Sequence, residues 1–496
     1  MPDLPLELYS AAQVRALDRH AIETAGIPSF VLMTRAGAAA FDALRKSWPT
    51  ARRILVACGA GNNGGDGYVV ARLAKAESFD VSVAALAGPE RLKGDARRAF
   101  DECRAAGVPI GRFDPAALTD AEVIVDALLG TGLDRPLDAG ACAIVGHINS
   151  SEKPVLAIDL PSGLNADTGA VMGAVVRATR TISFIGLKLG CFLGEGPSVT
   201  GTLEFASLDV PAAPAGLARP TVERIDRDLI ARVLPRRRRT AHKGEFGHVL
   251  IVGGNEGMAG AVQLCGEACL RSGAGLVSIA TRPAHAVAVT AARPELMCHG
   301  VAEPQSLRAL IERADVIAIG PGLGRDPWAR SLFEVVLDGH LPVVLDADAL
   351  NLLAESPHRR EDWILTPHPG EAARLLGVPT AEVQNDRFAT LRQLNGRFGG
   401  VVVLKGACTL IGFDDATPSL CDRGNPGMAT AGMGDVLTGV LAALRAQIGD
   451  PWNAARAAVL AHALAGDEAA KNGERGLIAS DLIARLPACL NPRRSN

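Results

Sequence analysis

The sequence predicts an α/β protein with two doubly wound domains, each built on a parallel sheet. Short apolar runs recur along the chain, each followed by a glycine- or acid-bearing turn and a helical segment: RRILVACG, AEVIVDALLG, KPVLAIDLPSG, HVLIVGG, DVIAIGPGLG, PVVLDADALN and WILTPHPGE. Runs without polar alternation are typical of strands buried on both faces, and their alternation with helices is typical of parallel sheets. Residues 209–226 are proline-rich and lack a hydrophobic period, which is typical of a linker. We therefore expect two domains, 1–220 and 221–496.

Length and composition agree with two large cores. The chain has 496 residues, of which 48% are hydrophobic and 21% charged. Its formal net charge of -3 would not attract nucleic acid or an anionic membrane. The basic run Arg236–Arg239 is interpreted as a solvated face of a linker. The N-terminus has no apolar signal segment, and the 10 cysteines form no C-x-x-C pair. We expect a cytoplasmic protein with reduced thiols and with no nucleic-acid or membrane partner.

The first apolar run leads into a turn whose glycines satisfy the G-x-G-x-x-G pattern: Gly59, Gly61 and Gly64. Alone, this pattern is a weak indication of dinucleotide binding. The acid that would hold a ribose at the end of the second strand is missing, because Asp80 precedes that strand. The oxygens of Asn62, Asn63 and Asp66 suit a hydrated cation or ribose hydroxyls. The alternative is an asparagine-rich turn stabilised by its own side chains.

Three motifs in order, NNGGDG, VDALLGTGLDRP and AIDLPSGLNADTG, resemble the NAD(P)H-hydrate epimerase family, a YjeF-type domain with a Rossmann-like fold. The match covers most of residues 10–210. It implies interconversion of the R and S hydrates of reduced nicotinamide at ring carbon 6, and a K+ ion held by Asn63, Asp126 and Ser162. It also implies a substrate site made of Asn62, Asn63, Gly64, Gly65, Asp66, Gly130, Thr131, Gly132, Leu133, Asp134, Arg135, Pro136 and Asp159.

Epimerisation needs a proton acceptor and a proton donor beside the nicotinamide. An aspartate at one strand end, Asp159, and a lysine near a neighbouring strand end, Lys188 in TISFIGLKLG, are our candidates for these catalytic roles. The alternative for Lys188 is an exposed lysine without a role, which the spacing does not exclude.

In the second half, residues 425–439 read NPGMATAGMGDVLTG and place bare backbone ahead of an apolar helix. Unpaired N–H groups at a helix start attract anions, and glycine lets a phosphate approach the chain. Asp435 stands at this junction, where its carboxylate would repel a phosphate. A base that takes the proton from a hydroxyl attacking the phosphate explains its position, and a plain helix cap is the alternative.

Other strand ends of this half carry similar features. GPGLG, residues 320–324, is a bare loop across which a ligand can lie, and KGACT, residues 405–409, offers a cation and a hydroxyl to a nucleotide. His368 and Glu371 stand between a strand and a helix, where we expect His368 to contact a ligand, its alternative being a structural role. No second histidine lies at metal-ligand spacing from His368.

The motifs GMAGA, GPGLG, DADALN, TPHPGEAARLLG, KGA and NPGMATAGMGDVLTG together resemble ADP-dependent NAD(P)H-hydrate dehydratase, which has a ribokinase-like fold, over roughly 225–490. The resemblance implies that ADP or ATP, with Mg2+, phosphorylates the C6 hydroxyl of the S hydrate (NADHX or NADPHX), after which phosphate leaves. With ADP as the donor, the products are AMP, phosphate and reduced NAD(P). A homo-oligomer is also expected. The implied substrate contacts are Ala261, Gly322, His368 and Asp435, and the implied nucleotide contacts are Lys405, Gly406, Ala407, Cys408, Thr409 and Gly434.

Two other interpretations remain at this stage. The second half is also compatible with a ribokinase-like small-molecule kinase that retains its phosphorylated product, since GMGD alone does not exclude it. The first half is also compatible with a non-catalytic nucleotide-binding module, because related folds lose chemistry. The presence of Asn63, Asp126, Asp159 and Ser162 argues against that module.

Overall fold

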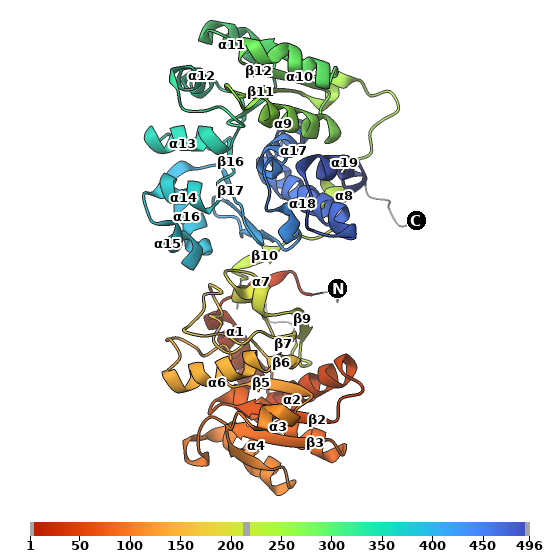
Figure 1. The fold of residues 1–496 in the computed structure, drawn as a ribbon, viewed down its shortest axis with the longest axis vertical. Coiled ribbons are helices and arrows are strands. Elements are labelled where there is room, and N and C mark those ends of the chain that lie inside the picture. Colours follow the sequence, from red (N-terminus) through yellow and green to blue (C-terminus); the bar gives the residue numbers. More distant parts are fainter. Residues whose placement is uncertain (1–3, 212–218, 492–496) are drawn as a thin grey trace. The chain divides into compact units, whose positions relative to one another are not determined.

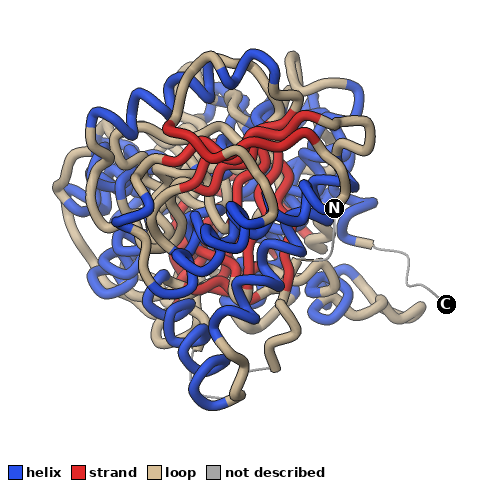
Figure 2. The backbone as a smooth tube through the Cα atoms, turned by 90° about the horizontal axis from the view of Figure 1, so that it is seen from below, coloured by secondary structure: helices blue, strands red, loops and turns tan. Residues whose placement is uncertain are grey.

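The protein is described by a computed structural model, which covers residues 4–211 and 219–491. The chain divides into two compact units, residues 1–223 (unit 1) and 224–496 (unit 2). In each unit the strands lie inside and the helices cover them (Figures 1 and 2). The predicted pair of doubly wound α/β folds is confirmed.

The seven-stranded sheet of unit 1 is parallel throughout, with the order β4-β3-β2-β5-β6-β7-β9. Its strands are β2 (Arg53–Cys58), β3 (Asp80–Ala85), β4 (Ile110–Arg112), β5 (Val123–Ala127), β6 (Val155–Ile158), β7 (Arg180–Phe184) and β9 (Thr202–Ala206). The strand order reverses between β2 and β5. In open parallel sheets, ligands bind beyond the carboxyl ends of the strands at such a switch point.

The helices of unit 1 are α1 (Ala11–Arg19), α2 (Ser29–Ser47), α3 (Asn62–Ala76), α4 (Gly94–Ala105), α5 (Ala117–Asp120), α6 (Ala139–Ser150) and α7 (Gly196–Val199). A short π-helix, His20–Thr24, continues α1. A separate short strand, β1 (Glu7–Tyr9), pairs in parallel with β8 (Leu187–Lys188) and antiparallel with β10 (Val222–Arg224). Asp80 is the first residue of β3, so the end of that strand carries no acid, as the sequence predicts.

The sheet of unit 2 has the order β13-β12-β11-β14-β15-β16-β17-β18-β19. The strands from β13 to β17 are parallel, and β18 and β19 continue the sheet antiparallel. The bounds are β11 (His248–Val252), β12 (Leu276–Thr281), β13 (Met297–Gly300), β14 (Val316–Ile319), β15 (Val343–Leu345), β16 (Ile364–Leu365), β17 (Val401–Leu404), β18 (Thr409–Phe413) and β19 (Ser419–Cys421).

The helices of unit 2 are α8 (Leu229–Val233), α9 (Ala259–Arg271), α10 (Ala286–Ala292), α11 (Pro304–Ile311), α12 (Pro327–Leu337), α13 (Ala347–Glu355), α14 (Pro369–Leu376), α15 (Thr380–Asn385), α16 (Arg387–Phe398), α17 (Met433–Gln447), α18 (Pro451–Ala469) and α19 (Ala479–Leu490). Helix α17 lies at the centre of the core. Its apolar residues are buried as the helical period predicts: Val436, Leu437, Val440, Leu441 and Leu444.

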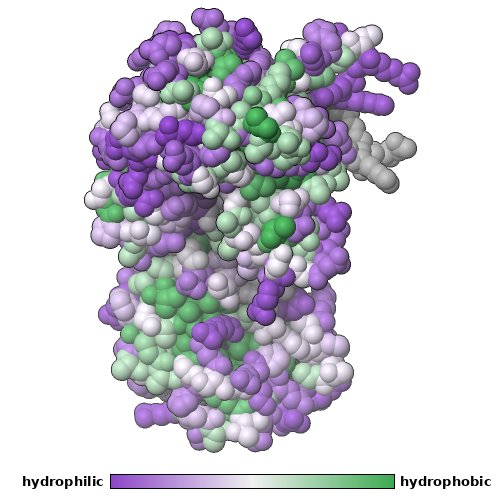
Figure 3. All heavy atoms as spheres, turned by 45° about the horizontal axis from the view of Figure 1, so that its top comes forward, coloured by the Kyte–Doolittle hydropathy of each residue, from purple (hydrophilic) through white to green (hydrophobic). Residues whose placement is uncertain are grey.

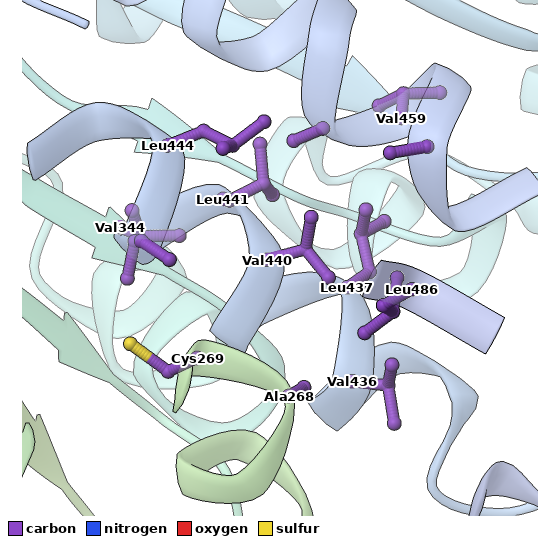
Figure 4. Packing of buried hydrophobic residues seen from close by; sticks show 14 of the residues in the cluster. Ala268, Cys269, Val344, Val436, Leu437, Val440, Leu441, Leu444, Val459 and Leu486 are labelled. Carbon is purple, nitrogen blue, oxygen red and sulfur yellow. The ribbon is translucent and has the colours of Figure 1, made fainter. Parts of the chain in front are cut away.

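Figure 4 shows these side chains packing against Ala268 and Cys269 of α9, Val344 of β15, Val459 of α18 and Leu486 of α19. Burying one such aliphatic side chain stabilises the fold by about 1.5–3 kcal/mol. Because neighbours on several sides hold α17, its first turn is fixed relative to the strand ends.

On the face shown in Figure 3, hydrophilic side chains cover most of the surface and apolar side chains form limited patches. Within residues 4–211 and 219–491, no helix has both the length and the apolar composition that crossing a bilayer requires. All 10 cysteines are free.

Candidate active site

Unit 1 contains a cavity of about 480 Å³ at the carboxyl ends of its central strands. The segments that follow β2, β5, β6 and β7 all contribute to its wall. Among the residues predicted to bind substrate, the cavity is lined by Asn62, Asn63, Asp66, Gly130, Thr131, Gly132, Leu133 and Asp159, and it is also lined by Lys188. Residues predicted from three separate motifs therefore lie around one space.

Asp159 and Lys188 form an ion pair in this cavity. The Lys188 ammonium also donates to Ser183 Oγ at 3.2 Å and to the Phe184 carbonyl at 3.0 Å. Lys188 is 1% exposed, so its interpretation as an exposed lysine is wrong. It lies on β8, beside β1, rather than at the end of a strand of the main sheet. A buried ammonium held by three acceptors is fixed for proton transfer with its carboxylate partner.

Asp159 directly follows β6 in an unusual backbone conformation, with φ of 69°. A non-glycine residue in this left-handed region is uncommon and strained, and such strain occurs at functional sites. The other carboxylate oxygen of Asp159 accepts hydrogen bonds from the Thr131 hydroxyl and, at 3.3 Å, from the Thr131 amide. The loop after β5 is thereby fixed to the carboxylate.

The three predicted potassium ligands converge on the backbone of 128–130. The Ser162 amide and hydroxyl donate to Asp126 at 2.8 and 2.6 Å, and the Leu129 amide donates to Ser162 Oγ at 2.8 Å. Both polar side-chain atoms of Asn63 are buried and have no hydrogen-bond partner among the residues that the structure describes. A methyl group placed on Gly130 would lie 3.2 Å from Asn63 Oδ1. An amide oxygen without an internal partner, a buried carboxylate and a hydroxyl, each next to the backbone of 128–130, are a donor set that fits a hard cation.

Burial raises the pKa of Asp126 to about 6, against the hydrogen bonds from Ser162 that favour its charged form. A carboxylate in this setting gains stability from a nearby positive charge.

Three further carboxyl groups line the same cavity, those of Asp18, Asp66 and Asp95. Burial raises the pKa of Asp18 to about 6, and burial together with Asp159 and Asp18 holds the pKa of Asp66 well above its usual range. Sequence reasoning missed Asp18, which lies in the last turn of α1, two residues before the π-helix begins at His20. A helical irregularity of this kind often occurs at functional sites, but nothing in the residue pattern signals it.

The other residues predicted to bind substrate, within 62–66 and 130–136, do not line the cavity. Gly64 and Gly65 are buried in α3, and a Cβ on Gly64 would lie 2.1 Å from the Gly59 carbonyl oxygen. Gly64 lets α3 approach the backbone that follows β2, and Gly65 lets α3 pack closely against Met33 of α2 and Ala96 of α4. Asp134, Arg135 and Pro136 are exposed beyond the cavity wall.

In unit 2, α17 begins as the sequence predicts. Its N-cap is Gly432, with φ of 85°, and no side chain caps the helix. His462 of α18 contacts the first turn of α17, with its Nε2 3.0 Å from the Met433 carbonyl oxygen. Burial lowers the pKa of His462 to about 4, so the ring is neutral and donates this bond. The helix start therefore presents uncapped N–H groups, which attract anions.

Asp435 lies in the first turn of α17 but caps nothing. In the described part of the chain its carboxylate accepts no hydrogen bond within 3.5 Å. Burial and the neighbouring Asp346 carboxylate raise the pKa of Asp435 to about 7, with Lys405 opposing. A half-buried carboxyl that titrates near neutrality and has no internal partner is suited to act as a general base.

A buried ion pair lies beneath this helix start. Lys405 Nζ is 2.7 Å from Asp346 Oδ1, and the hydroxyls of Thr366 and Thr438 donate to Asp346 at 2.7 and 2.8 Å. A Cβ on Gly434 would lie 3.5 Å from Lys405 Nζ. Lys405 and Gly434, both predicted to contact the nucleotide, therefore lie next to each other. Ion pairing with Lys405 holds the pKa of Asp346 below its usual range although burial opposes this.

His368 caps α14. Its Nδ1 accepts from the amides of Gly370 and Glu371 at 3.0 and 3.4 Å, while Glu371 accepts from the His368 amide at 2.8 Å. The ring is half exposed, so the cap leaves its outer edge accessible to a ligand. Glu371 is buried, which raises its pKa to about 7, and lies 3.8 Å from Lys405.

The structure also brings Ala261 and Gly322 together. Gly322 has φ of 56°, and a Cβ placed on it would lie 3.1 Å from that of Ala261. The two residues, far apart in sequence, form a close contact between the 320–324 loop and α9. The 405–409 loop is held from the side opposite the solvent by Arg387, a residue that the sequence analysis does not single out.

Comparisons with known proteins match both units. Residues 29–190 match the family model for the YjeF-related protein N-terminus, and residues 249–488 match that for NAD(P)H-hydrate dehydratase. The chain is 48% identical over 98% of its length to the bifunctional NAD(P)H-hydrate repair enzyme of Coxiella burnetii, of which it covers 99%. It is 44% identical to that of Escherichia coli over 99% of this chain and 95% of the relative.

Among solved structures, a ribokinase-like superfamily protein from Enterococcus faecalis covers 54% of this chain and 95% of its own, with 33% identity and a TM-score of 0.51. This likeness agrees with the ribokinase-like fold expected for unit 2. The full-length relatives carry both units in one chain, as this protein does. The chain belongs to the family of bifunctional NAD(P)H-hydrate repair enzymes.

Proposed function

We propose that unit 1 interconverts the R and S hydrates of NADH and NADPH, and that unit 2 dehydrates the S hydrate at the expense of ADP or ATP. The observation that carries this proposal is the unpartnered Asp435 carboxylate beside the uncapped start of α17. A helix cap would not leave its carboxylate without a hydrogen bond. Family membership supports dehydration over a kinase that retains its product.

In unit 2, Asp435 takes the proton of the C6 hydroxyl as that oxygen attacks the terminal phosphorus of the nucleotide. The bond from phosphorus to the bridging oxygen breaks, and AMP leaves when ADP is the donor. The C6–O bond then breaks with loss of phosphate and of a proton from C5, which restores the dihydronicotinamide ring. The α17 amides and Lys405 stabilise the charge on the phosphoryl oxygens.

In unit 1, the hydroxyl-bearing ring carbon inverts only if a bond from it to oxygen or nitrogen breaks and re-forms. Either route takes a proton from one atom and gives it to another. Asp159 and Lys188, paired in the cavity, are proposed as the acceptor and donor. Fixed orientation of both groups by Thr131, Ser183 and Phe184 supports this assignment.

We propose that Asn63, Asp126 and Ser162 hold K+ in unit 1, supported by the unpartnered Asn63 amide next to Gly130 and by the hydrogen bond between Ser162 and the buried Asp126. When bound, the cation supplies positive charge to Asp126 and to the backbone of 128–130, and so orders the loop that reaches Asp159. For Mg2+, the described residues contain no cluster of three or more His, Cys, Asp or Glu side chains able to hold a metal. We propose that Mg2+ enters unit 2 with the phosphates of the nucleotide, as is usual for this ion.

We also propose that the protein is a cytoplasmic homo-oligomer. Light scattering of the purified chain measures the oligomeric state, and a monomer at micromolar concentration rejects that part of the proposal.

The experiment that tests the function uses the purified chain with a mixture of both NADH hydrates and ADP. We expect the absorbance of the reduced nicotinamide to recover fully, with one AMP and one phosphate formed per NADH. A stable phosphorylated hydrate without NADH would reject dehydration. Recovery that stops when only the S hydrate is consumed would reject epimerisation.

A further inference from the structure

Arg387, the first residue of α16, is buried beneath the 405–409 loop without a carboxylate partner. Its side chain is 4% exposed, and in the described residues it forms no ion pair with Asp or Glu. Burying a guanidinium without a counter-ion is unfavourable. The position of Arg387 therefore calls for a compensating role.

Among the described residues, the guanidinium donates hydrogen bonds to backbone carbonyl groups alone. Nη1 donates to the carbonyls of Ala407 and Cys408, and Nη2 donates to those of Leu404 and Lys405 at 3.2 and 3.4 Å. One side chain thus fixes the orientation of nearly every peptide group in the loop.

In a planar trans peptide, the carbonyl and the following N–H point in opposite directions. The carbonyls of Lys405 and Ala407 point toward Arg387, so the N–H groups of Gly406 and Cys408 point away from it. Neither N–H donates to any group in the described part of the chain. Two outward N–H groups in the loop that carries Lys405, with Ala407 between them in the sequence, form an anion-binding surface.

The backbone of the loop has two residues with positive φ, and both lie next to the Arg387 guanidinium. Cys408 has φ of 52°, which is uncommon for a non-glycine residue. Gly406 has φ of 149°, and a Cβ placed on it would lie 2.9 Å from Arg387 Nη2. The guanidinium therefore occupies the space directly under Gly406.

We propose that Arg387 is a positioning residue that turns the amides of Gly406 and Cys408 toward the phosphate oxygens of the bound nucleotide. Its unpaired positive charge beneath the loop adds to the attraction, and the anion that balances it is the nucleotide itself. This inference rests on the proposed function, because it takes the 405–409 loop as the nucleotide site.

The first test is Arg387→Lys, which keeps the charge but has too few N–H groups in the wrong geometry to hold four carbonyls. We expect the Kd and the KM for ADP to rise roughly tenfold to hundredfold, the range of one or two lost charge-assisted hydrogen bonds. The kcat at saturating ADP should change little. A purely structural defect would reduce the amount of folded enzyme, and hence the apparent kcat, without raising KM.

Arg360→Lys is the matched control. Arg360 also holds two backbone carbonyls, those of Gly339 and Leu341, but it has the Asp362 carboxylate as a partner. We expect this variant to keep the KM for ADP of the unaltered chain. An equal rise of KM in both variants would overturn the specific role of Arg387.

The second test needs no variant. Hydrogen exchange of the unaltered chain should show the amides of Gly406 and Cys408 protected when ADP is added. An unchanged KM in Arg387→Lys, or no protection of these amides, would overturn the inference. A third variant, Lys405→Ala, distinguishes failure of the proposed nucleotide site from failure of the role of Arg387. Normal ADP binding by this variant would reject the 405–409 loop as the nucleotide site. Weak binding by Lys405→Ala together with normal binding by Arg387→Lys would reject only the role of Arg387.

Discussion

The ammonium group of Lys405 lies 2.7 Å from the carboxylate of Asp346, although 59 positions separate the two residues. The other oxygen of Asp346 accepts from Thr438, which lies on α17 one turn after Asp435. One buried carboxylate thus joins the end of β15, the 405–409 loop and the helix that carries the proposed base. The catalytic geometry of unit 2 depends on this three-way connection.

Asp435→Asn should lower the rate of dehydration by about 10²–10⁴, the usual contribution of a general base. ADP should still bind, because the uncapped amides of α17 and the Lys405–Asp346 pair remain in place. Absorbance recovery from the S hydrate measures the rate, and calorimetry with ADP measures binding. If the variant loses nucleotide binding together with activity, Asp435 has a structural role instead.

The dehydration rate should depend on pH through Asp435. Burial and Asp346 raise its pKa to about 7, and a base acts only when deprotonated, so kcat should fall about tenfold per pH unit below 7. Asp346 stays ionised over this pH range, because Lys405 holds its pKa below the usual range although burial opposes this. Lys405 stays protonated, because Asp346 holds its pKa above the usual range although burial opposes this.

Glu371 is the control for this profile, because its pKa is also raised to about 7. The acid limb of kcat should persist in Glu371→Gln. Its disappearance in that variant would assign the limb to Glu371 and not to Asp435.

Asp159→Asn and Lys188→Met should each abolish interconversion of the hydrates, with a loss of about 10²–10⁴ in rate. Dehydration of pure S hydrate should be unchanged, since these residues lie in unit 1. Chiral chromatography of the unreacted hydrates measures the outcome. Lys188→Met should be the more stable variant, because Asp159→Asn leaves a buried ammonium without its counter-ion. Epimerisation at the normal rate in Asp159→Asn would exclude this carboxylate as a proton carrier.

Potassium should stabilise unit 1 by mass action, with the melting temperature rising as K+ is titrated against a constant ionic strength of choline chloride. Asn63→Ala should remove this dependence, because it deletes the orphaned amide oxygen. Asn149→Ala is a suitable control, since Asn149 bonds to the backbone of Val175 and Arg177 and lies outside the cavity lining. A K+ response that persists in Asn63→Ala would place the cation elsewhere.

Much of the fold followed from local patterns. Apolar runs without alternation predicted the parallel strands, and the period of Val436, Leu437, Val440, Leu441 and Leu444 predicted the buried face of α17. The turns at the end of a strand or the start of a helix could be predicted from glycines such as Gly432, because only glycine adopts a positive φ without strain. These features are encoded within a few residues.

The sequence by itself determined the two α/β units, the bare start of α17 and the residue types that meet at the strand ends. Only the tertiary structure decided which of them touch: that Lys188 is buried against Asp159, that Asp435 caps nothing, that Asp18 lines the cavity of unit 1, and that Arg387 donates to carbonyls of the 405–409 loop. The physical reason is that burial, ion pairing and the partners of a polar group arise from segments far apart in the chain. The spacing of residues within one segment does not determine the distances between side chains of different segments.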